Sequence, residues 1–578
     1  MNLQAICHRP KSNYAYAICD NTILIRIRTA KGDCKRVRLV IGVKHKWADK
    51  ETYDMEKTAS DHLFDYYQFS YQVRESQLGY YFLISDDTTT VVYSESGFSQ
   101  KFDDENAYFH YFQYPYINEP DVHKVPEWVH KAVFYQIFVD RFARGNGGFQ
   151  ADLRPWGELP DPHSFYGGDL KGILDKLDYL CDLGINALYL TPIFKSPSNH
   201  KYDTCDYREV DPMFGDKETL VRLVCEAHKR GMRVVLDGVF NHCSWYLPQF
   251  QDVLRNGDKS KYKDWFYIES FPITRYSEKE VNDYSRPLDL SNLNYKVFAT
   301  SPNMPKLNTE NREIRQYLLD TVVYWMREAD LDGWRLDVSD EVSHDFWREF
   351  RKVVKQENPD TLILGENWHN AYPWLIGDQF DGVMNYPFTK SAIETFAMER
   401  KNAADLAADL SGYLMQNTWQ AQNAMLNLLD SHDTMRFLTW CDYDEEKLKM
   451  AWMLMFTYVG MPCIYYGDEI GMSGKGDPDC RRTFEWDENK WNLDLHEFVK
   501  DLIHIRKKRK SLQYGGIKIY TEDEVFYLYR EHREEKTLMV LNLTQKTIAL
   551  ERGWKCALTT RKFEDGNMNS TSSAIFYL

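Results

Sequence analysis

The chain lacks several features that mark common classes of protein. It contains no stretch of about twenty apolar residues of the kind that crosses a membrane. Its first residues show no basic segment followed by an apolar run and a small-residue cleavage site, so no secretory signal is visible. The eleven cysteines include no Cys-x-x-Cys pair, which argues against a disulfide framework or a structural zinc site. We therefore expect a cytoplasmic protein with reduced thiols and no membrane segment.

Positive charge is also scarce. The chain has 71 Lys and Arg against 87 Asp and Glu, a net charge of −16. Nucleic acids and anionic membrane surfaces are bound by clustered Lys and Arg, so neither is an expected partner. The one dense basic run, residues 506–510, is expected to be a solvated helix end.

Aromatic residues are plentiful, at 15% of the chain with 39 Tyr and 16 Trp. Such a composition fits surfaces on which sugar rings stack. Large strand-rich domains, however, also use Tyr and Trp to fill their interior and edges, so the composition alone leaves both interpretations open.

The two ends of the chain have the pattern of β domains. Within residues 1–125, short apolar runs at 23–28, 37–41, 66–69 and 80–84 are separated by turn-prone clusters, which predicts a β-sandwich. Pro115, Pro120 and Pro126 mark a linker after it. Residues 506–578 return to short strands, at 525–529 and 537–542, and are expected to form a smaller β domain.

The middle of the chain, residues 126–505, alternates strands with amphipathic helices. Eight strands are expected, at 133–139, 185–192, 232–239, 333–338, 361–366, 381–386, 424–430 and 461–466. A helix is expected over 311–330, where apolar residues recur every three or four positions. This alternation predicts the α/β class and a parallel (β/α)8 barrel. Residues 243–303, too long for an ordinary loop, should form an inserted subdomain beside the mouth.

Four of the expected strands run into a carboxylate flanked by Arg, Asn or His, at Asp237, Asp337, Glu366 and Asp433. Active sites of such barrels lie at the carboxyl ends of the strands, so these side chains should converge. The stretches contain no arrangement for a nucleophilic Ser or Cys. Carboxylates with the imidazoles of His242 and His432 suit cleavage of an uncharged polar substrate through a cationic transition state, as in glycoside hydrolysis.

Residue spacing suggests a role for two of these carboxylates. Arg335 and Asp337 lie two apart on a strand and so share a face, where the Arg would keep the Asp ionised, as a glycosyl-enzyme nucleophile requires. A structural ion pair closing the barrel has the same pattern. Glu366 lies near the aromatic Trp368, which favours the neutral form of a general acid, although a solvated loop carboxylate would look the same.

The remaining polar groups are expected around the sugar. Asp433 could accept hydrogen bonds from sugar hydroxyls and help to keep Glu366 protonated. His242 and His432 would donate to the same hydroxyls. A metal site is the alternative for two histidines beside carboxylates, but no His-x-x-x-His spacing occurs.

Together these stretches resemble the α-amylase family, glycoside hydrolase family 13, from residues 135–142 through 467–471. The resemblance implies that Asp337 is the nucleophile, Glu366 the acid/base and Asp433 the transition-state stabiliser. It also implies sugar-binding roles for the following residues: Arg335, His242 and His432 as contacts, Tyr202 as a stacking platform, and Asp237 as a supporting carboxylate.

Residues 304–308, Met-Pro-Lys-Leu-Asn, are similar to a segment of the neopullulanase, cyclomaltodextrinase and maltogenic amylase subgroup. Asp477 and Arg481 match the residues that hold a second glucose in that subgroup. Its members carry an N-terminal β-sandwich resembling a starch-binding module. They are commonly intracellular dimers in which this domain of one chain helps to cover the cleft of the other, so the resemblance implies a homodimer acting on α-glucan oligosaccharides.

The chain departs from the subgroup at two places. Ser339-Asp340-Glu341 stands where Ala-Asn-Glu is usual, a change that bears on acceptor preference and transglycosylation. In the loop after the first barrel strand, Arg144 stands where related enzymes often offer calcium ligands. We expect no required cofactor or metal and no calcium in that loop, although Asn146 and Asp169 could contribute oxygens.

The function expected from the sequence is retaining hydrolysis of α-1,4-glucosidic bonds in cyclomaltodextrins, maltooligosaccharides, pullulan or starch, with some transglycosylation. An α-1,6-glucosidase or a glucosyl transferase of the same family would share the three carboxylates. A non-catalytic carbohydrate-binding barrel is the alternative from another class, because a barrel can lose its nucleophile or acid without losing its fold.

Overall fold

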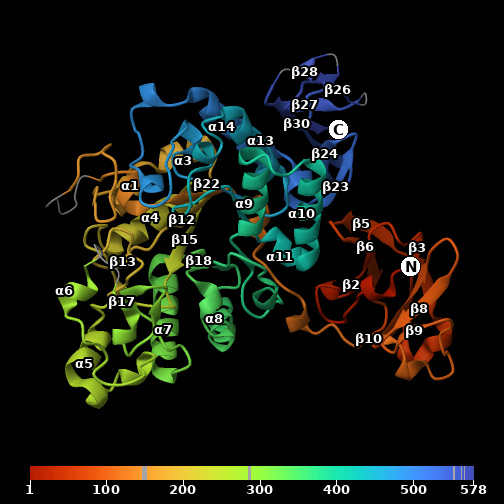
Figure 1. Ribbon diagram of the computed structural model, residues 1–578, viewed down its shortest axis with the longest axis horizontal. Helices are drawn as coiled ribbons and strands as arrows, with labels where there is room; N and C mark the ends of the chain where they lie inside the picture. The colour runs from red at the N-terminus through yellow and green to blue at the C-terminus, as the bar shows by residue number, and fades with distance from the viewer. Residues whose placement is uncertain (146–152, 284–287, 551–552, 562, 565) are drawn as a thin grey trace.

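An eight-stranded parallel barrel lies at the centre of the molecule (Figure 1). The structure is a computed structural model that describes residues 1–145, 153–283, 288–550, 553–561, 563–564 and 566–578. The strands follow the order β20-β19-β18-β15-β12-β11-β22-β21. A parallel bridge between Met384 and Leu426 links the two ends of this order and closes the barrel.

The eight strands predicted from the sequence are all present, at β11 Phe134–Ile137, β12 Ala187–Leu190, β15 Arg233–Gly238, β18 Gly333–Leu336, β19 Leu362–Gly365, β20 Gly382–Val383, β21 Leu426–Leu428 and β22 Met461–Tyr465. They are buried along their whole length, apart from one exposed end at Arg233, as expected of a barrel covered by helices. The strand expected over 381–386 is only two residues long, because Asn385 already caps the next helix and accepts a hydrogen bond from Phe388 N.

Helices surround the barrel, and the longest is the one predicted over 311–330. The main helices are α3 Leu177–Leu183, α4 Lys217–Lys229, α7 Arg312–Ala329, α8 His344–Glu357, α9 Tyr386–Ala392, α10 Ala403–Gln416, α13 Glu445–Thr457 and α14 Leu493–Lys508. Helix α7 begins at an Asn311 cap and buries Ile314, Leu318, Val322 and Trp325 against the barrel. The predicted barrel fold is therefore confirmed.

The long excursion after β15 builds one side of the barrel mouth. It contains α5 Pro248–Asn256, α6 Glu278–Val281 and the strands β16 Val297–Phe298 and β17 Ser301–Pro305, which pair antiparallel. Isolated bridges join His242 to Lys306 and Phe266 to Leu307. These bridges hold the excursion against the carboxyl end of β15.

The N-terminal part forms two sheets that share one core. One sheet has the order β1-β2-β6-β5 and the other β4-β3-β7-β8-β9, with β10 beside β7. Their principal strands are β2 Thr22–Ala30, β6 Phe64–Gln72, β3 Arg36–Val43 and β7 Leu78–Ser85. The outer strands are β1 Ala15–Cys19, β5 Glu56–Ser60, β4 Glu51–Asp54, β8 Thr90–Ser94, β9 Gly97–Ser99 and β10 Phe112–Tyr114. Ile23, Ile25 and Ile27 of one sheet pack with Val37, Leu39 and Ile41 of the other, which is a β-sandwich arrangement.

The N-terminal sandwich contacts the barrel at α10 and at α11 Trp419–Asn423. Arg26 Nη1 donates to Met415 O at 2.8 Å, and Tyr16 Oη accepts from Trp419 N at 3.0 Å. The linker over 115–128 contains the short 3-10 helix η4 Glu119–Asp121. A second 3-10 helix, η5 Glu127–Lys131, begins at the end of the linker and continues beyond it.

The C-terminal part contains a five-stranded sheet, in the order β23-β24-β25-β30-β27, and a small three-stranded sheet. The strands of the larger sheet are β23 Gly516–Glu522, β24 Val525–His532, β25 Glu535–Asn542, β30 Ser572–Tyr577 and β27 Lys555–Thr559. The prediction of a solvated helix end at 506–510 is wrong for Arg506, which is 2% exposed. Its guanidinium donates to Phe456 O at 3.1 Å and to Gly460 O, because the free carbonyls at the end of α13 need donors. Among the described residues, no helix has the length and apolar character to cross a membrane.

Candidate active site

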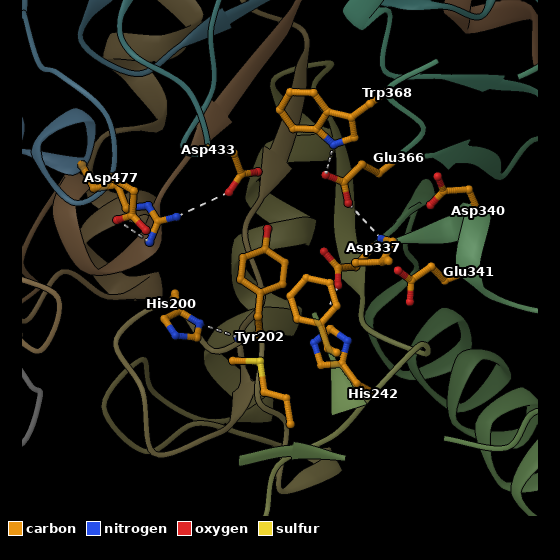
Figure 2. A pocket seen from close by; sticks show the side chains of 14 residues that line it. His200, Tyr202, His242, Asp337, Asp340, Glu341, Glu366, Trp368, Asp433 and Asp477 are labelled. Carbon is orange, nitrogen blue, oxygen red and sulfur yellow. Dashed lines mark hydrogen bonds and ion pairs between the residues drawn. The ribbon is translucent and has the colours of Figure 1, made fainter. Parts of the chain in front are cut away.

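A cavity of about 500 Å³ opens at the carboxyl ends of the barrel strands (Figure 2). Eight of the residues predicted from the sequence line it: Tyr202, His242, Asp337, Glu366, Trp368, Asp433, Asp477 and Arg481. The other three, Asp237, Arg335 and His432, are at most 1% exposed and lie beneath the lining. The predicted residues therefore form one site in two layers.

Arg335 binds three carboxylates at once. Its Nη1 is 2.9 Å from Asp237 Oδ2 and 3.0 Å from Asp337 Oδ1, and its Nη2 is 3.0 Å from Glu366 Oε2. From the sequence spacing, Arg335 was expected to keep Asp337 ionised. Because the guanidinium is shared, burial and then the charge on Glu366 raise the pKa of Asp337 well above its ordinary value, and Arg335 only opposes this.

Glu366 is held by donors on both of its carboxylate oxygens. Val338 N donates to Oε2 at 2.9 Å, and Trp368 Nε1 donates to Oε1 at 3.1 Å. The Trp368 ring stacks on Tyr386 with centroids 3.7 Å apart and planes at 5°. Trp368 remains 42% exposed, so it offers its other face to the cavity while it orients Glu366.

Tyr202, His432 and Asp237 form a hydrogen-bonded relay beneath the cavity. Gln136 donates to Nδ1 of His432 at 2.8 Å, which assigns the proton of the neutral ring to Nε2. That Nε2 is 2.7 Å from Tyr202 Oη, and the Tyr202 hydroxyl donates to Asp237 Oδ2 at 2.9 Å. The rings of Tyr202 and His432 are parallel within 3°. The relay therefore fixes the Tyr202 ring in the cavity wall.

His432 had been expected to donate to sugar hydroxyls. In the structure its ring is 0% exposed, and its Nε2 also lies 3.2 Å from Asp433 Oδ2. Burial, followed by the charges of Arg481 and Arg335, lowers the pKa of His432 well below its ordinary value, so the ring is neutral. His432 thus orients Tyr202 and Asp433 in this structure.

His242 and Asp337 face each other with unused polar atoms. His242 Nε2 and Asp337 Oδ2 are 3.9 Å apart, and neither has a hydrogen-bond partner among the described residues. Burial lowers the pKa of His242 to about 3, so its ring is neutral. Buried polar atoms without partners are rare, and here both line the cavity. A ligand hydroxyl would satisfy both of them.

The opposite wall carries Asp433, Asp477 and Arg481. Arg481 Nη1 lies 2.9 Å from Asp477 Oδ1, and Nη2 lies 3.4 Å from Asp433 Oδ1. Its Nε donates to His432 O at 2.7 Å, which ties this wall to the Tyr202 relay. Figure 2 shows the Asp477 side chain across the cavity from Asp337 and Glu366.

Six further residues of the lining were not among the predicted site residues: His200, Phe298, Met304, Val338, Asp340 and Glu341. Most of them lie within segments that the sequence had already singled out. Phe298 had no such signal, since it belongs to the two-residue strand β16 inside the long excursion. It stacks on His242 at 4.5 Å and 16°, a contact that only the folded excursion creates.

No group of three or more His, Cys, Asp or Glu side chains that could hold a metal ion occurs within the described ranges. Arg144 donates from Nε to Tyr166 O at 2.6 Å and from Nη2 to Arg154 O at 2.9 Å. Asp169 caps α2 Leu170–Asp175 and accepts from Gly145 N at 2.9 Å. Asn146, the other residue considered for calcium, lies outside the described residues.

The arrangement can perform acid/base and nucleophilic chemistry on a neutral polar ligand. Asp337 and Glu366 come from neighbouring parallel strands and are joined through one guanidinium, while Asp433 is held on a separate loop. Trp368, Tyr202 and Phe298 supply aromatic surface around these carboxyl groups. Such a combination suits a sugar ring, which presents both apolar faces and hydroxyls.

Known proteins match the whole length of the chain. The model of the α-amylase catalytic domain matches residues 136–565, and that of the α-amylase N-terminal Ig-like domain matches residues 1–118. A cyclomaltodextrinase of Geobacillus thermopakistaniensis (strain MAS1) is 48% identical over 550 residues, which cover 94% of this chain and 91% of the relative. An intracellular maltogenic amylase of Bacillus subtilis (strain 168) is 46% identical over 524 residues, which cover 89% and 86%.

A solved structure of a cyclomaltodextrinase superposes with a TM-score of 0.89 at 42% identity, covering 100% of this chain and 98% of that chain. The family model spans far more than half of the chain, and the relatives extend over nearly all of it. The chain therefore belongs to the α-amylase family of glycoside hydrolases.

Proposed function

We propose that this enzyme hydrolyses α-1,4-glucosidic bonds with retention of configuration, in cyclomaltodextrins, maltooligosaccharides, pullulan or starch, and that it also transfers some glycosyl groups. The observation that carries the proposal is the cavity in which one buried guanidinium binds both Asp337 and Glu366. The relatives named cyclomaltodextrinase and maltogenic amylase support the substrate class.

In the proposed mechanism, Glu366 protonates the glycosidic oxygen while Asp337 attacks the anomeric carbon. The bond from that carbon to the leaving oxygen breaks, and an ester to Asp337 forms. Glu366 then takes a proton from water, whose oxygen displaces Asp337 and restores both carboxyl groups. Asp433 would accept hydrogen bonds that tighten as the ring flattens. Retention requires the Asp337 and Glu366 carboxyl groups to be roughly 5 to 5.5 Å apart.

The other predicted residues would bind the sugars. Tyr202 would stack on the ring that is cleaved, and His242 would donate to its hydroxyls from the unpartnered Nε2. Trp368 would cover the departing side. Asp477 and Arg481 would hold a second glucose, an assignment supported by their ion pair on the opposite wall. Asp237, Arg335 and His432 lie beneath the cavity lining and would hold the lining residues in position through hydrogen bonds and ion pairs.

We further propose the domain bounds, the oligomeric state, the location and the cofactor needs of the enzyme. Residues 1–125, 126–505 and 506–578 would be its domains, with 243–303 as the inserted subdomain, and the active form would be a cytoplasmic homodimer. The name of the intracellular Bacillus subtilis relative supports the location. Catalysis would need no cofactor and no calcium; the proposal is supported by Arg144, a cation in the loop after β11 whose guanidinium donates to the Tyr166 and Arg154 carbonyls.

The decisive experiment is a product analysis. Proton NMR of the first product released from maltotriose should show the α anomer, and a β anomer would contradict the retaining mechanism. Parallel assays on cyclomaltodextrin, pullulan, starch and panose separate the α-1,4-hydrolase from an α-1,6-glucosidase and from a transferase. An absence of turnover on all four substrates would favour the non-catalytic barrel.

A further inference from the structure

A second cavity, of about 390 Å³, lies next to the active-site cavity. His200, Asp477 and Arg481 line both cavities, so these three residues form the boundary between them. Figure 2 shows His200 and Asp477 on the side of the active-site cavity opposite Glu366. A volume of this size is within the range that holds small ligands. The second cavity therefore extends the site away from the departing side that Trp368 would cover.

Asn199 gives the second cavity a fixed hydrogen-bond acceptor. The residue is 4% exposed, and its Nδ2 donates to Pro162 O at 3.0 Å and to Ser164 O at 2.9 Å. Both amide protons are thereby used, which fixes the orientation of the amide group. Among the described residues, its Oδ1 has no hydrogen-bond partner, although Asn199 lines the cavity. Polar atoms of side chains this deeply buried are normally paired, so this oxygen is available to a ligand hydroxyl.

His200 adds a donor at the boundary between the cavities. Its Nδ1 accepts from Tyr202 N at 3.1 Å, which assigns the proton of the neutral ring to Nε2. Burial, followed by the charges of Arg481 and Lys201, lowers the pKa of His200 to about 3, so the ring stays neutral. Within the part of the chain that the structure describes, Nε2 has no hydrogen-bond partner. A neutral donor and a neutral acceptor match the hydroxyls of a sugar.

Two aromatic side chains, Phe165 and Tyr246, also line the second cavity. Tyr246 is 36% exposed and belongs to the excursion after β15, whereas Phe165 lies shortly before α2. The bonds from Asn199 to the carbonyls of Pro162 and Ser164 hold the segment that carries Phe165. Aromatic rings beside fixed polar groups suit a pyranose ring, because it has apolar faces and a rim of hydroxyls.

We propose that the second cavity binds a third glucose unit of the substrate, next to the unit at Asp477 and Arg481. The inference rests on the proposed function, in which those two residues hold a second glucose. Counted from the bond that is cleaved, the first unit would stack on Tyr202 and the second would lie at Asp477 and Arg481. The third would lie beside Tyr246, with hydroxyls bonded to Asn199 and His200. The enzyme would then favour substrates with at least three glucose units on the side that becomes bonded to the nucleophile.

The test compares the release of 4-nitrophenol from its α-maltoside and from its α-maltotrioside. Direct release of nitrophenol places every glucose unit on the side bonded to the nucleophile, so only the maltotrioside reaches the second cavity. In the wild type, kcat/KM should be on the order of tenfold higher for the maltotrioside, because the cavity adds hydrogen bonds and stacking. In Y246A this ratio should fall by at least about threefold, whereas Y246F keeps the ring and should keep the ratio.

Controls separate the possible failures. Y520A should have the wild-type ratio, because Tyr520 is exposed to a similar extent, 38%, and lies in β23 outside both cavities. N199A removes the acceptor and should also lower the ratio, and its circular dichroism spectrum shows whether the variant folds. A wild-type ratio below about 2, or equal ratios in Y246A and the wild type, overturns the third-unit site whatever the folding of N199A. If neither glycoside releases nitrophenol, the proposed function itself fails, and the third-unit site fails with it.

Discussion

Replacing Arg335 by Met would test the electrostatic design of the site. The guanidinium is 0% exposed and lies within about 3 Å of Asp237, Asp337 and Glu366, at 2.9, 3.0 and 3.0 Å. Removing one partner of a buried ion pair costs about 3–5 kcal/mol, because the remaining charges are left uncompensated. We expect R335M to lose at least this much free energy of unfolding at pH 8, and to lose its activity.

The loss should depend on pH in a defined direction. Burial raises the pKa of Asp237 to about 6 in the wild type, while Arg335 opposes the rise, so the variant should have a still higher value. A carboxyl group with a raised pKa in the folded state contributes its stability below its unfolded pKa and loses it as pH rises through the folded pKa. The loss of unfolding free energy in the variant should therefore be smaller at pH 5 than at pH 8. The two losses should differ by about 1.4 kcal/mol for each unit by which the substitution raises the pKa of Asp237 further.

Urea unfolding at pH 5 and pH 8, followed by tryptophan fluorescence and circular dichroism, measures this difference. The two signals must give coincident transitions, since a chain of this size can unfold in steps. R327M is the matched control, because Arg327 forms an exposed ion pair with Glu357 at 2.7 Å and should cost nothing measurable at either pH. Equal losses at both pH values, or a loss below about 1 kcal/mol, would refute the reasoning.

Three further predictions concern the reaction. D337N should lower kcat by at least about a thousandfold with an unchanged circular dichroism spectrum, and near-wild-type turnover would show that another carboxylate attacks the sugar. W368A should raise KM and lower kcat together on maltotriose, because Trp368 both borders the cavity and donates to Glu366. W368F keeps an aromatic ring without the donor, so it should restore the wild-type KM but not the wild-type kcat. EDTA should leave activity and melting temperature unchanged, and a fall of several degrees that added calcium reverses would overturn the expectation of a metal-free loop after β11.

The dimer prediction needs a test other than removal of the N-terminal domain. Residues of that domain bond to α10 and α11, through Arg26 to Met415 O and through Tyr16 to Trp419 N, so a truncation would expose this contact surface. Light scattering of the full-length chain is expected to give the mass of a dimer at micromolar concentration. A monomeric mass would contradict the homodimer.

Much of the fold could be predicted because it follows from local patterns. Alternating apolar strands and amphipathic helices indicated the eight barrel strands and α7 directly. The expectation that the active site lies at the carboxyl ends of the strands also placed Asp337 and Glu366 at the same end of the barrel, because parallel strands have their carboxyl ends on the same side. Strand lengths were less accurate: β20 is only Gly382–Val383, because the helix cap at Asn385 competes for the same residues.

The contacts that tune the site were not predictable in this way. Arg335 and Asp237 are 98 residues apart in the sequence, and no local pattern reports which charges share one partner. Phe298 reaches His242 only because β16 folds back against β17. Arg506 is buried because the free carbonyls at the end of α13 lie next to it, although its sequence context is strongly basic.

The sequence by itself therefore determined the order of strands and helices, the residue types at the strand ends and the family, because each of these depends on neighbouring residues along the chain. The tertiary structure alone decided how charge is distributed among the carboxyl groups. Arg335 is shared by three of them, and Glu341 is compensated by Lys306. Electrostatic interactions depend on distance and burial in space, and those are set by the packed barrel rather than by position in the sequence.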